Sequence, residues 1–128
     1  MKKTLSAGVA AAAMCILISG GNAAAADLKA GSRVFNKCKA CHSLEAGKNM
    51  IGPSLAGMFG RTAGTTDYNY SKAMKEAGAG GLVWSDGTVA DYVRSPKDFV
   101  KGNKMVFVGI KKDSELENLI AFLRESTK

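Results

Sequence analysis

The chain has 128 residues, 23% of them charged, and a formal net charge of +7 at pH 7. This length supports one compact domain with only a modest hydrophobic core. The lysines are spread without long runs or interleaved aromatic residues, which excludes the pattern of a nucleic-acid-binding surface. The charge favours an acidic protein partner, although most lysines taken singly are also explained as solvated charges.

Residues 1–26 have the pattern of a cleaved secretory signal. They begin with two lysines, continue in an apolar stretch and end in alanines that fit cleavage after Ala26. The apolar stretch is shorter than the roughly 20 residues that cross a membrane, so an uncleaved anchor is the less favoured alternative. Cleavage would remove Cys15 and two of the 18 basic residues but none of the 11 acidic ones. We therefore expect a periplasmic domain of residues 27–128, with two cysteines and a net charge of about +5.

The first expected element of the mature chain is a helix over residues 27–40. Apolar or small residues recur there near helical spacing, at Leu28, Gly31, Val34, Phe35 and Cys38. Gly31 leaves a small spot on the apolar side of this helix. A second helix could therefore approach closely at Gly31.

Three further helices are expected. One covers residues 70–77 and stops at Gly78, and another covers residues 86–94 and stops before Pro96. The C-terminal helix is marked by the run Ser114-Glu115-Leu116-Glu117, which has the sequence of a capping box. An apolar stripe follows from Leu116, Leu119, Ile120 and Leu123, with Phe122 beside it.

Two long connections, residues 47–69 and 95–113, separate these helices and are rich in glycine and turn residues. Short alternating strands are missing from the sequence. We therefore predict an all-α fold of about four to five short helices. Two long irregular connections in so small a domain are reasonable if the loops wrap around something large and flat.

Two cysteines and the only histidine lie within five consecutive positions, Cys38 to His42. A thioredoxin-like redox pair would follow a strand, and no strand is predicted before this run. A structural zinc site needs four ligands, and the mature chain has no other cysteine or histidine. A chance surface pair would tend to close a strained disulfide in an oxidising compartment. Attachment of one haem c uses the whole run, because Cys38 and Cys41 can form thioethers and His42 can bind the iron.

A metal-bound histidine is usually oriented by a hydrogen bond from its second ring nitrogen. The carbonyl of Pro53, about ten residues after His42, is a candidate acceptor, although a simple loop turn also explains the Gly52-Pro53 pair. Polar side chains between this turn and the later helices could donate hydrogen bonds to haem propionates: Arg61, Tyr68, Tyr70, Ser71 and Trp84. For each of them singly, packing or a surface position is an equal explanation.

The sixth iron ligand cannot be a second histidine, and methionine is the remaining soft ligand. The mature chain offers Met50, Met58, Met74 and Met105. The first two lie on the segment expected beneath His42, and core packing explains Met74 well. Met105 is far from His42 in sequence and lies in a loop with glycines that could cross the opposite haem face.

With these features in place, the sequence resembles class I cytochrome c, especially the soluble bacterial members close to the mitochondrial protein. The similarity covers nearly all of residues 31–122. It is carried, in order and at family-like spacing, by GSRVFNKCKACH, GPSLAGMFGR, the region of Tyr70, LVWSDGTVADYVRSP, KGNKMVFVGIKK and LENLIAFL. The fold implied is the small cytochrome c fold around one covalently bound haem.

The resemblance also implies roles for the matching residues. Cys38 and Cys41 would carry the haem, His42 and Met105 would be the axial ligands, and the Pro53 carbonyl would orient His42. The propionates would be served by Arg61, Tyr70, Ser71 and Trp84. It further implies that Tyr92 lies near Met105, and that Gly31 and Phe35 pack against Leu119 and Phe122.

Three residues depart from the mitochondrial pattern. Lys101 stands where that pattern has proline, Asn103 where it has threonine, and Met74 where it has asparagine. These differences affect the stiffness and the hydrogen bonding of the loop that would carry the methionine ligand. Through that loop they affect the redox potential.

We expect a one-electron carrier and not an enzyme, because both axial positions stay occupied and no substrate reaches the iron. The expected partners are acidic electron-transfer proteins, such as a quinol-cytochrome c reductase and a terminal oxidase or photosynthetic reaction centre. We expect a monomer without nucleic-acid binding or stable membrane insertion. The rivals are a haem peroxidase, which would want a distal acid/base group such as histidine, and a thiol-disulfide oxidoreductase, which needs free thiols.

Overall fold

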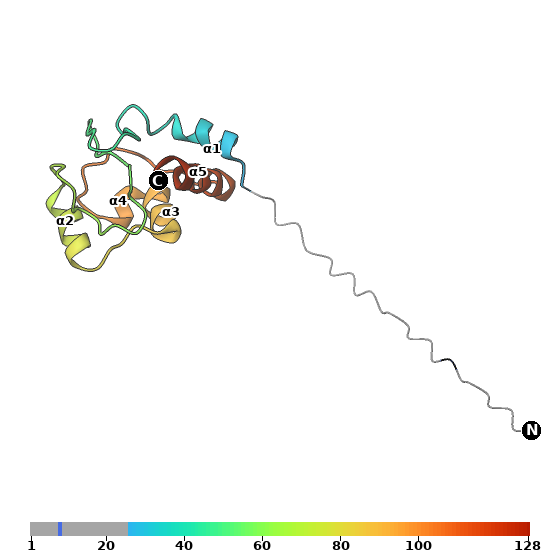
Figure 1. Cartoon of the computed structure of the whole chain (residues 1–128). Coiled ribbons are helices and arrows are strands. Elements are labelled where there is room, and N and C mark those ends of the chain that lie inside the picture. Colours follow the sequence, from blue (N-terminus) through green and yellow to red (C-terminus); the bar gives the residue numbers. More distant parts are fainter. Residues whose placement is uncertain (1–7, 9–25) are drawn as a thin grey trace, which may run out of the picture.

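The computed structural model describes Gly8 and residues 26–128, so nearly all of the predicted signal segment, Cys15 included, lies outside the described residues. The described part contains five helices joined by long loops (Figure 1): α1 (Leu28–Phe35), α2 (Lys72–Ala79), α3 (Asp86–Arg94), α4 (Pro96–Phe99) and α5 (Asp113–Ser126). Its β structure is limited to one isolated bridge between Thr62 and Val83. The predicted all-α class is confirmed. None of the helices in this part is long and apolar enough to cross a membrane.

The crossing of α1 and α5 brings the two ends of the domain together (Figure 1). A Cβ atom built on Gly31 would lie 2.1 Å from the carbonyl oxygen of Asn118 and 2.7 Å from Cβ of Phe122, so only glycine fits at this contact. The rings of Phe35 and Phe122 pack beside it, with centroids 5.3 Å apart. The expected close approach at Gly31 is confirmed.

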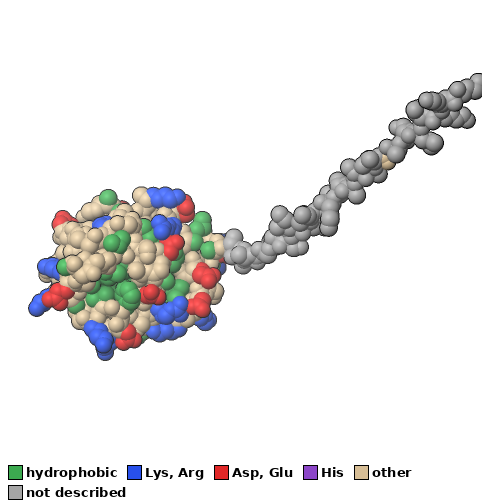
Figure 2. Space-filling model, turned by 90° about the horizontal axis from the view of Figure 1, so that it is seen from below, with side chains coloured by type: hydrophobic (Ala, Val, Ile, Leu, Met, Phe, Trp, Pro, Cys, Tyr) green, Lys and Arg blue, Asp and Glu red, His purple; other side chains and the backbone are tan. Residues whose placement is uncertain are grey.

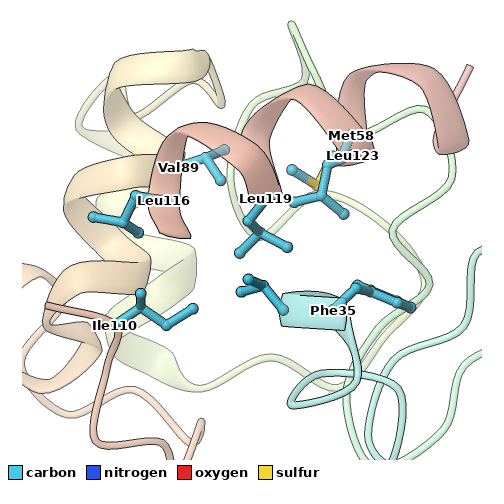
Figure 3. Close-up of a cluster of buried hydrophobic side chains, with 8 residues drawn as sticks. Phe35, Met58, Val89, Ile110, Leu116, Leu119 and Leu123 are labelled. Atoms are coloured by element: carbon cyan, nitrogen blue, oxygen red, sulfur yellow. The ribbon is translucent and has the colours of Figure 1, made fainter. Parts of the chain in front are cut away.

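The larger hydrophobic cluster lies beneath α5. Leu116, Leu119 and Leu123 point from one face of α5 toward Phe35 of α1 and toward Ile110 (Figure 3). Leu119 is 1% exposed and Ile110 is 2% exposed, so this helix face is sealed from water. A second, smaller cluster forms around α2 from Ala63, Met74 and Val100.

The N-terminal helix is shorter than expected. α1 ends at Phe35, whereas the periodicity predicted a helix to residue 40. After that point, the amide of Lys37 bonds to the carbonyl of Val34 and the amide of Cys38 to that of Phe35. The chain therefore tightens from hydrogen bonds four residues apart to bonds three residues apart, which carries it into the turn around Cys38.

The expected stop at Gly78 is wrong, because Gly78 lies inside α2, which runs to Ala79. Its Cβ would lie 1.8 Å from the carbonyl oxygen of Ala63, so this glycine serves a close contact between segments. The short helix α4 was not expected; it begins at Pro96, a residue that suits a first helical turn.

The expected capping box at Ser114 is also wrong. α5 begins two residues earlier than an N-cap at Ser114 would give, with Lys112 as an N-cap that makes no side-chain hydrogen bond. The first helical residue, Asp113, forms an ion pair with Arg94 at 2.6 Å, which favours the earlier start. The described part does contain a capping box at α3, where Ser85 and Thr88 bond reciprocally.

Candidate functional site

A cavity of about 470 Å³ lies between the Cys-x-x-Cys-His segment and the loop that carries Met105. This volume is typical of a site for a small organic ligand or cofactor. All ten site residues predicted from the sequence line the cavity: Cys38, Cys41, His42, Pro53, Arg61, Tyr70, Ser71, Trp84, Tyr92 and Met105. The fold thus brings together residues from both long connections and from α3.

His42 is held in one orientation by the loop beneath it. Its Nδ1 atom lies 2.8 Å from the carbonyl oxygen of Pro53, so Nδ1 carries the proton and donates it to this carbonyl. Burial lowers the pKa of His42, and the bond to Pro53 opposes this effect only in part. The imidazole is therefore neutral at pH 7, with the lone pair of Nε2 available to a metal ion.

Gly52 packs against the imidazole of His42, a contact that the sequence analysis missed. A Cβ atom at this position would lie 2.5 Å from Cε1 of the ring and 2.9 Å from each ring nitrogen. The Gly52 amide donates to the carbonyl of Cys41 at 2.8 Å, which fastens the loop to the motif. A glycine before a proline gave a turn signal, but nothing in that signal indicates contact with a ring.

The two cysteines lie on one tight turn and are not joined in a disulfide. The amides of Cys41 and His42 both donate to the carbonyl of Cys38, at 3.1 and 3.0 Å. Burial raises the pKa of Cys38 to about 11, although the nearby charge of Lys37 opposes it. The Cys38 thiol is therefore protonated at neutral pH, whereas a redox-active cysteine of the thioredoxin type has a lowered pKa.

The four candidate methionines have different surroundings. Met50 is 43% exposed and does not line the cavity. Met58 and Met74 line the cavity but are 6% and 7% exposed, and they belong to the two hydrophobic clusters. Met105 is half-buried and lines the cavity, and it lies in the second long connection, far from the cysteines in sequence.

Hydrogen bonds hold the Met105 backbone in place. The Met105 amide donates to Oδ1 of Asn103 at 2.7 Å, and the hydroxyl of Tyr92 donates to the same oxygen at 3.2 Å. Tyr92 and Met105 are thus near each other, as the resemblance implied. Burial raises the pKa of Tyr92 to about 12, so its hydroxyl stays a donor at neutral pH. From the sequence, Asn103 was noted only as a departure from the mitochondrial pattern. Its contacts with Met105 and Tyr92 were not predicted.

The four residues expected to serve propionates already make contacts of their own. One guanidinium nitrogen of Arg61 donates to the carbonyl of Ala56 at 3.0 Å. The hydroxyl of Tyr70 lies 2.5 Å from that of Thr66, and the Ser71 hydroxyl accepts the Met74 amide as N-cap of α2. The Trp84 ring packs on Tyr92, with centroids 5.2 Å apart. Tyr68, a further candidate, donates to the carbonyl of Ile51 and also lines the cavity.

This donor set fits a haem better than a bare metal ion. Within residues 26–128 and at Gly8, no group of three or more His, Cys, Asp or Glu side chains is arranged to hold a metal. The cavity instead joins a neutral imidazole and two thiols to apolar side chains such as Leu55, Val89 and Phe107. A flat, largely apolar group with a central metal matches these surroundings.

Known proteins resemble this chain in sequence and in structure. The family model for cytochrome c matches residues 28–127. Cytochrome c2 from Agrobacterium tumefaciens (strain II Chrys) is 50% identical over 99 residues, which are 76% of this chain and 89% of that protein. Cytochrome c-550 from Nitrobacter winogradskyi is 48% identical over 104 residues, 80% of this chain and 93% of that protein. The structure of cytochrome cH from Methylobacterium extorquens superimposes with a TM-score of 0.71 at 39% identity, covering 77% of this chain and 98% of that one.

A small helical fold around an apolar cavity, with a Cys-x-x-Cys-His run at its wall, defines a c-type haem protein. The chain belongs to the cytochrome c family. Membership implies one covalently bound haem c, and Cys38, Cys41 and His42 stand at the positions that attach it. The chain is thus a haem- and iron-binding protein of electron transport.

Proposed function

We propose that the chain is a periplasmic one-electron carrier whose haem is bound by Cys38 and Cys41 and ligated by His42 and Met105. The observation that carries this proposal is the single cavity that these four residues line, although Met105 comes from a distant part of the chain. The bound haem supplies an iron that alternates between ferric and ferrous. The protein residues attach it, fix both axial positions and exclude water.

The geometry around His42 supports its role as proximal ligand. The Nδ1–H group of His42 donates to the carbonyl of Pro53, and the lowered pKa of His42 leaves Nε2 unprotonated. Gly52 packs against the ring, so the ring cannot rotate toward the loop. A histidine prepared in this way needs no rearrangement to bind iron.

Elimination supports Met105 as the distal ligand. Met50 does not line the cavity, and Met58 and Met74 are packed in the hydrophobic clusters. Histidine and methionine together favour ferrous iron relative to two histidines, which suits a donor to a high-potential acceptor. Because both axial positions are then filled by the protein, we propose no enzymatic activity.

The cavity-lining polar residues Arg61, Tyr70, Ser71 and Trp84 are proposed to hold the propionates. Arg61 has five N–H groups, and one bond to Ala56 leaves others for a carboxylate. The Ser71 oxygen accepts a backbone bond, which leaves its own hydrogen to donate. The Tyr92 hydroxyl already donates to Asn103, so we propose that Tyr92 lies near Met105 and does not bind a propionate.

The rim of the cavity suits an acidic partner. Ile51 and Val106 line the cavity and are 76% and 102% exposed, so the rim has an apolar part. Seven exposed lysines lie near the haem-facing loops in sequence: Lys37, Lys39, Lys48, Lys97, Lys101, Lys104 and Lys111. Figure 2 shows one face of the domain, on which basic, acidic and hydrophobic side chains are interspersed. An apolar centre with a charged rim is typical of a transient protein interface.

Three of these lysines are the best candidates for docking. Within the described residues, Lys39, Lys97 and Lys101 form no ion pair and no side-chain hydrogen bond, whereas Lys37 and Lys48 face Glu115 and Glu45. The proposed partners are a quinol-cytochrome c reductase and a terminal oxidase or photosynthetic reaction centre. We propose that the chain meets them as a monomer without stable membrane insertion.

The bimolecular electron-transfer rate with an acidic oxidase domain tests this function. The rate should fall as ionic strength rises, because exposed charges are screened within about 8 Å at physiological salt. Lys101→Ala should lower the rate at low salt, and Lys29→Ala, on α1 and away from the cavity lining, is the matched control. A rate that does not change with salt would exclude this docking mode.

Two further measurements separate the alternatives. Acid-acetone extraction of denatured protein should leave the haem on the polypeptide, while a colourless chain with two titratable thiols would support the oxidoreductase. The intact mass of the periplasmic protein should correspond to a start at or near Asp27. A membrane-bound form that retains residues 1–26 would indicate a tethered carrier.

A further inference from the structure

The loop before Met105 contains a tight turn over residues 100–103. The Asn103 amide donates to the carbonyl of Val100 at 3.1 Å, and Gly102, the third residue of the turn, has φ of 88°. A positive φ at the third position marks a type II turn, in which proline is common at the second position. Here the second residue is Lys101, which has no ring to limit its backbone freedom.

The Asn103 side chain fastens this turn at four points. Nδ2 donates to the carbonyls of Pro96 and Val100, both at 2.8 Å. Oδ1 accepts from the Met105 amide at 2.7 Å and from the Tyr92 hydroxyl at 3.2 Å. Both donors and both acceptor sites of the amide are used, so no other group of its size could replace it fully.

The orientation of the amide is fixed by these partners. If oxygen and nitrogen were exchanged, the NH₂ group would face the Met105 amide and the oxygen would face two carbonyls. Asn103 therefore joins the start of α4, the turn and the Tyr92 side chain to the backbone of Met105. The position of the Met105 sulfur depends on where this backbone is held.

We propose that Asn103 is a positioning residue that holds Met105 opposite His42, and that its side chain compensates for the absence of proline at position 101. The inference rests on the proposed role of Met105 as distal ligand. Threonine at 103 has one hydroxyl, which can accept the Met105 amide but cannot donate to both carbonyls. Aspartate has the same shape as asparagine but lacks both donors, and its charge would face the carbonyls of Pro96 and Val100.

The test compares holoprotein variants by two measurements. The first is amide hydrogen exchange at Met105 in the ferrous protein, and the second is the pH at which the ferric thioether-to-iron charge-transfer band is lost. In Asn103→Asp the carboxylate still accepts the Met105 amide, but both bonds to the carbonyls of Pro96 and Val100 are lost, so the turn opens more often. Exchange at Met105 should therefore rise by about tenfold or more, since one lost hydrogen bond is worth about 1 kcal/mol. The band should disappear about one pH unit lower, since tenfold in an equilibrium corresponds to one unit. Asn36→Asp, at an exposed asparagine away from this loop and outside the cavity lining, is the matched control and should change neither value.

A double-mutant cycle tests the compensation. Asn103→Thr should show the same changes more weakly, and Lys101→Pro should reverse most of them in that background while having little effect in the wild type. Additive effects of Lys101→Pro and Asn103→Thr would contradict the compensation. If Asn103→Asp does not fold, Asn103→Thr alone tests the positioning role by the same two measurements.

The outcomes separate this inference from the proposed function. If Asn103→Asp and Asn103→Thr match the wild type in both measurements, the positioning role is wrong even though Met105 is a ligand. If the wild type has no charge-transfer band, or keeps it in Met105→Ala, the ligand assignment itself fails. Faster exchange at Met105 in the Asn103 variants would then show a backbone clamp without a role in ligation.

Discussion

Replacing Gly52 by alanine should displace the loop that orients His42. The new Cβ would lie 2.5 Å from Cε1 of the imidazole, whereas ordinary contacts begin at 3.4 Å, so ring and loop must separate by about 0.9 Å. If His42 is held by the iron, as proposed, the loop has to move. That movement stretches the 2.8 Å bond from His42 to the Pro53 carbonyl and the 2.8 Å bond from Gly52 to Cys41.

The expected loss of stability follows from these contacts. Overpacking costs about 1–3 kcal/mol and a weakened hydrogen bond about 1 kcal/mol, so the free energy of unfolding should fall by about 2–4 kcal/mol. For a domain near 100 residues this lowers Tm by at least about 8 °C. Circular dichroism of the holoprotein during heating measures it, and the visible spectrum reports whether His42 stays bound.

Gly87→Ala is the matched control. Gly87 lies in α3, and a Cβ there would have Ser85 Oγ at 3.9 Å as its nearest neighbour. Alanine should therefore raise stability by about 0.5–1 kcal/mol, the helical preference of alanine over glycine. If Gly52→Ala unfolds at the temperature of the wild type, the proposed packing of Gly52 on His42 is refuted.

Three further substitutions follow from other contacts. Gly31→Ala should lower the free energy of unfolding by about 1–3 kcal/mol in urea titrations, because its Cβ would overlap the carbonyl of Asn118; an unchanged value would contradict the crossing of α1 and α5. Ser85→Ala removes the capping box of α3 and should lower stability by about 1 kcal/mol in the same assay, with no loss expected if the cap is absent. The pKa of Tyr92 is about 12 in the folded protein against 10.0 unfolded, so its buried neutral hydroxyl contributes stability that is lost as pH rises from 10 to 12. Tyr92→Phe should make urea stability fall less steeply over this interval, and an equal slope would count against a buried phenol.

Features set by neighbouring residues could be predicted from the sequence. The bounds of α3 agree with the prediction, because Pro96 is a local signal for its end; the structure adds a cap from Ser85 at its start. The Cys-x-x-Cys-His run was sufficient to predict the haem, since one turn carries both thiols and the imidazole. The all-α class followed from helical periodicity and the lack of alternating strands.

Features set by contacts between distant residues could not be predicted in the same way. Gly78 had the signal of a helix stop, but the carbonyl of Ala63 explains why glycine is needed inside α2. The Ser114 capping box matched a sequence pattern, yet α5 starts at Asp113, where Arg94 supplies an ion pair from another helix. The four bonds of Asn103 likewise depend on how α3, α4 and the loop meet.

The central claim is that Met105 is the distal ligand of a haem whose other ligand is His42. The most direct measurement is the ferric thioether-to-iron charge-transfer band at neutral pH in Met105→Ala, compared with Met50→Ala, Met58→Ala and Met74→Ala. We predict that the band is lost only in Met105→Ala, because only that methionine lines the cavity outside both hydrophobic clusters. A band that persists in Met105→Ala and disappears in one of the other three variants would contradict the account.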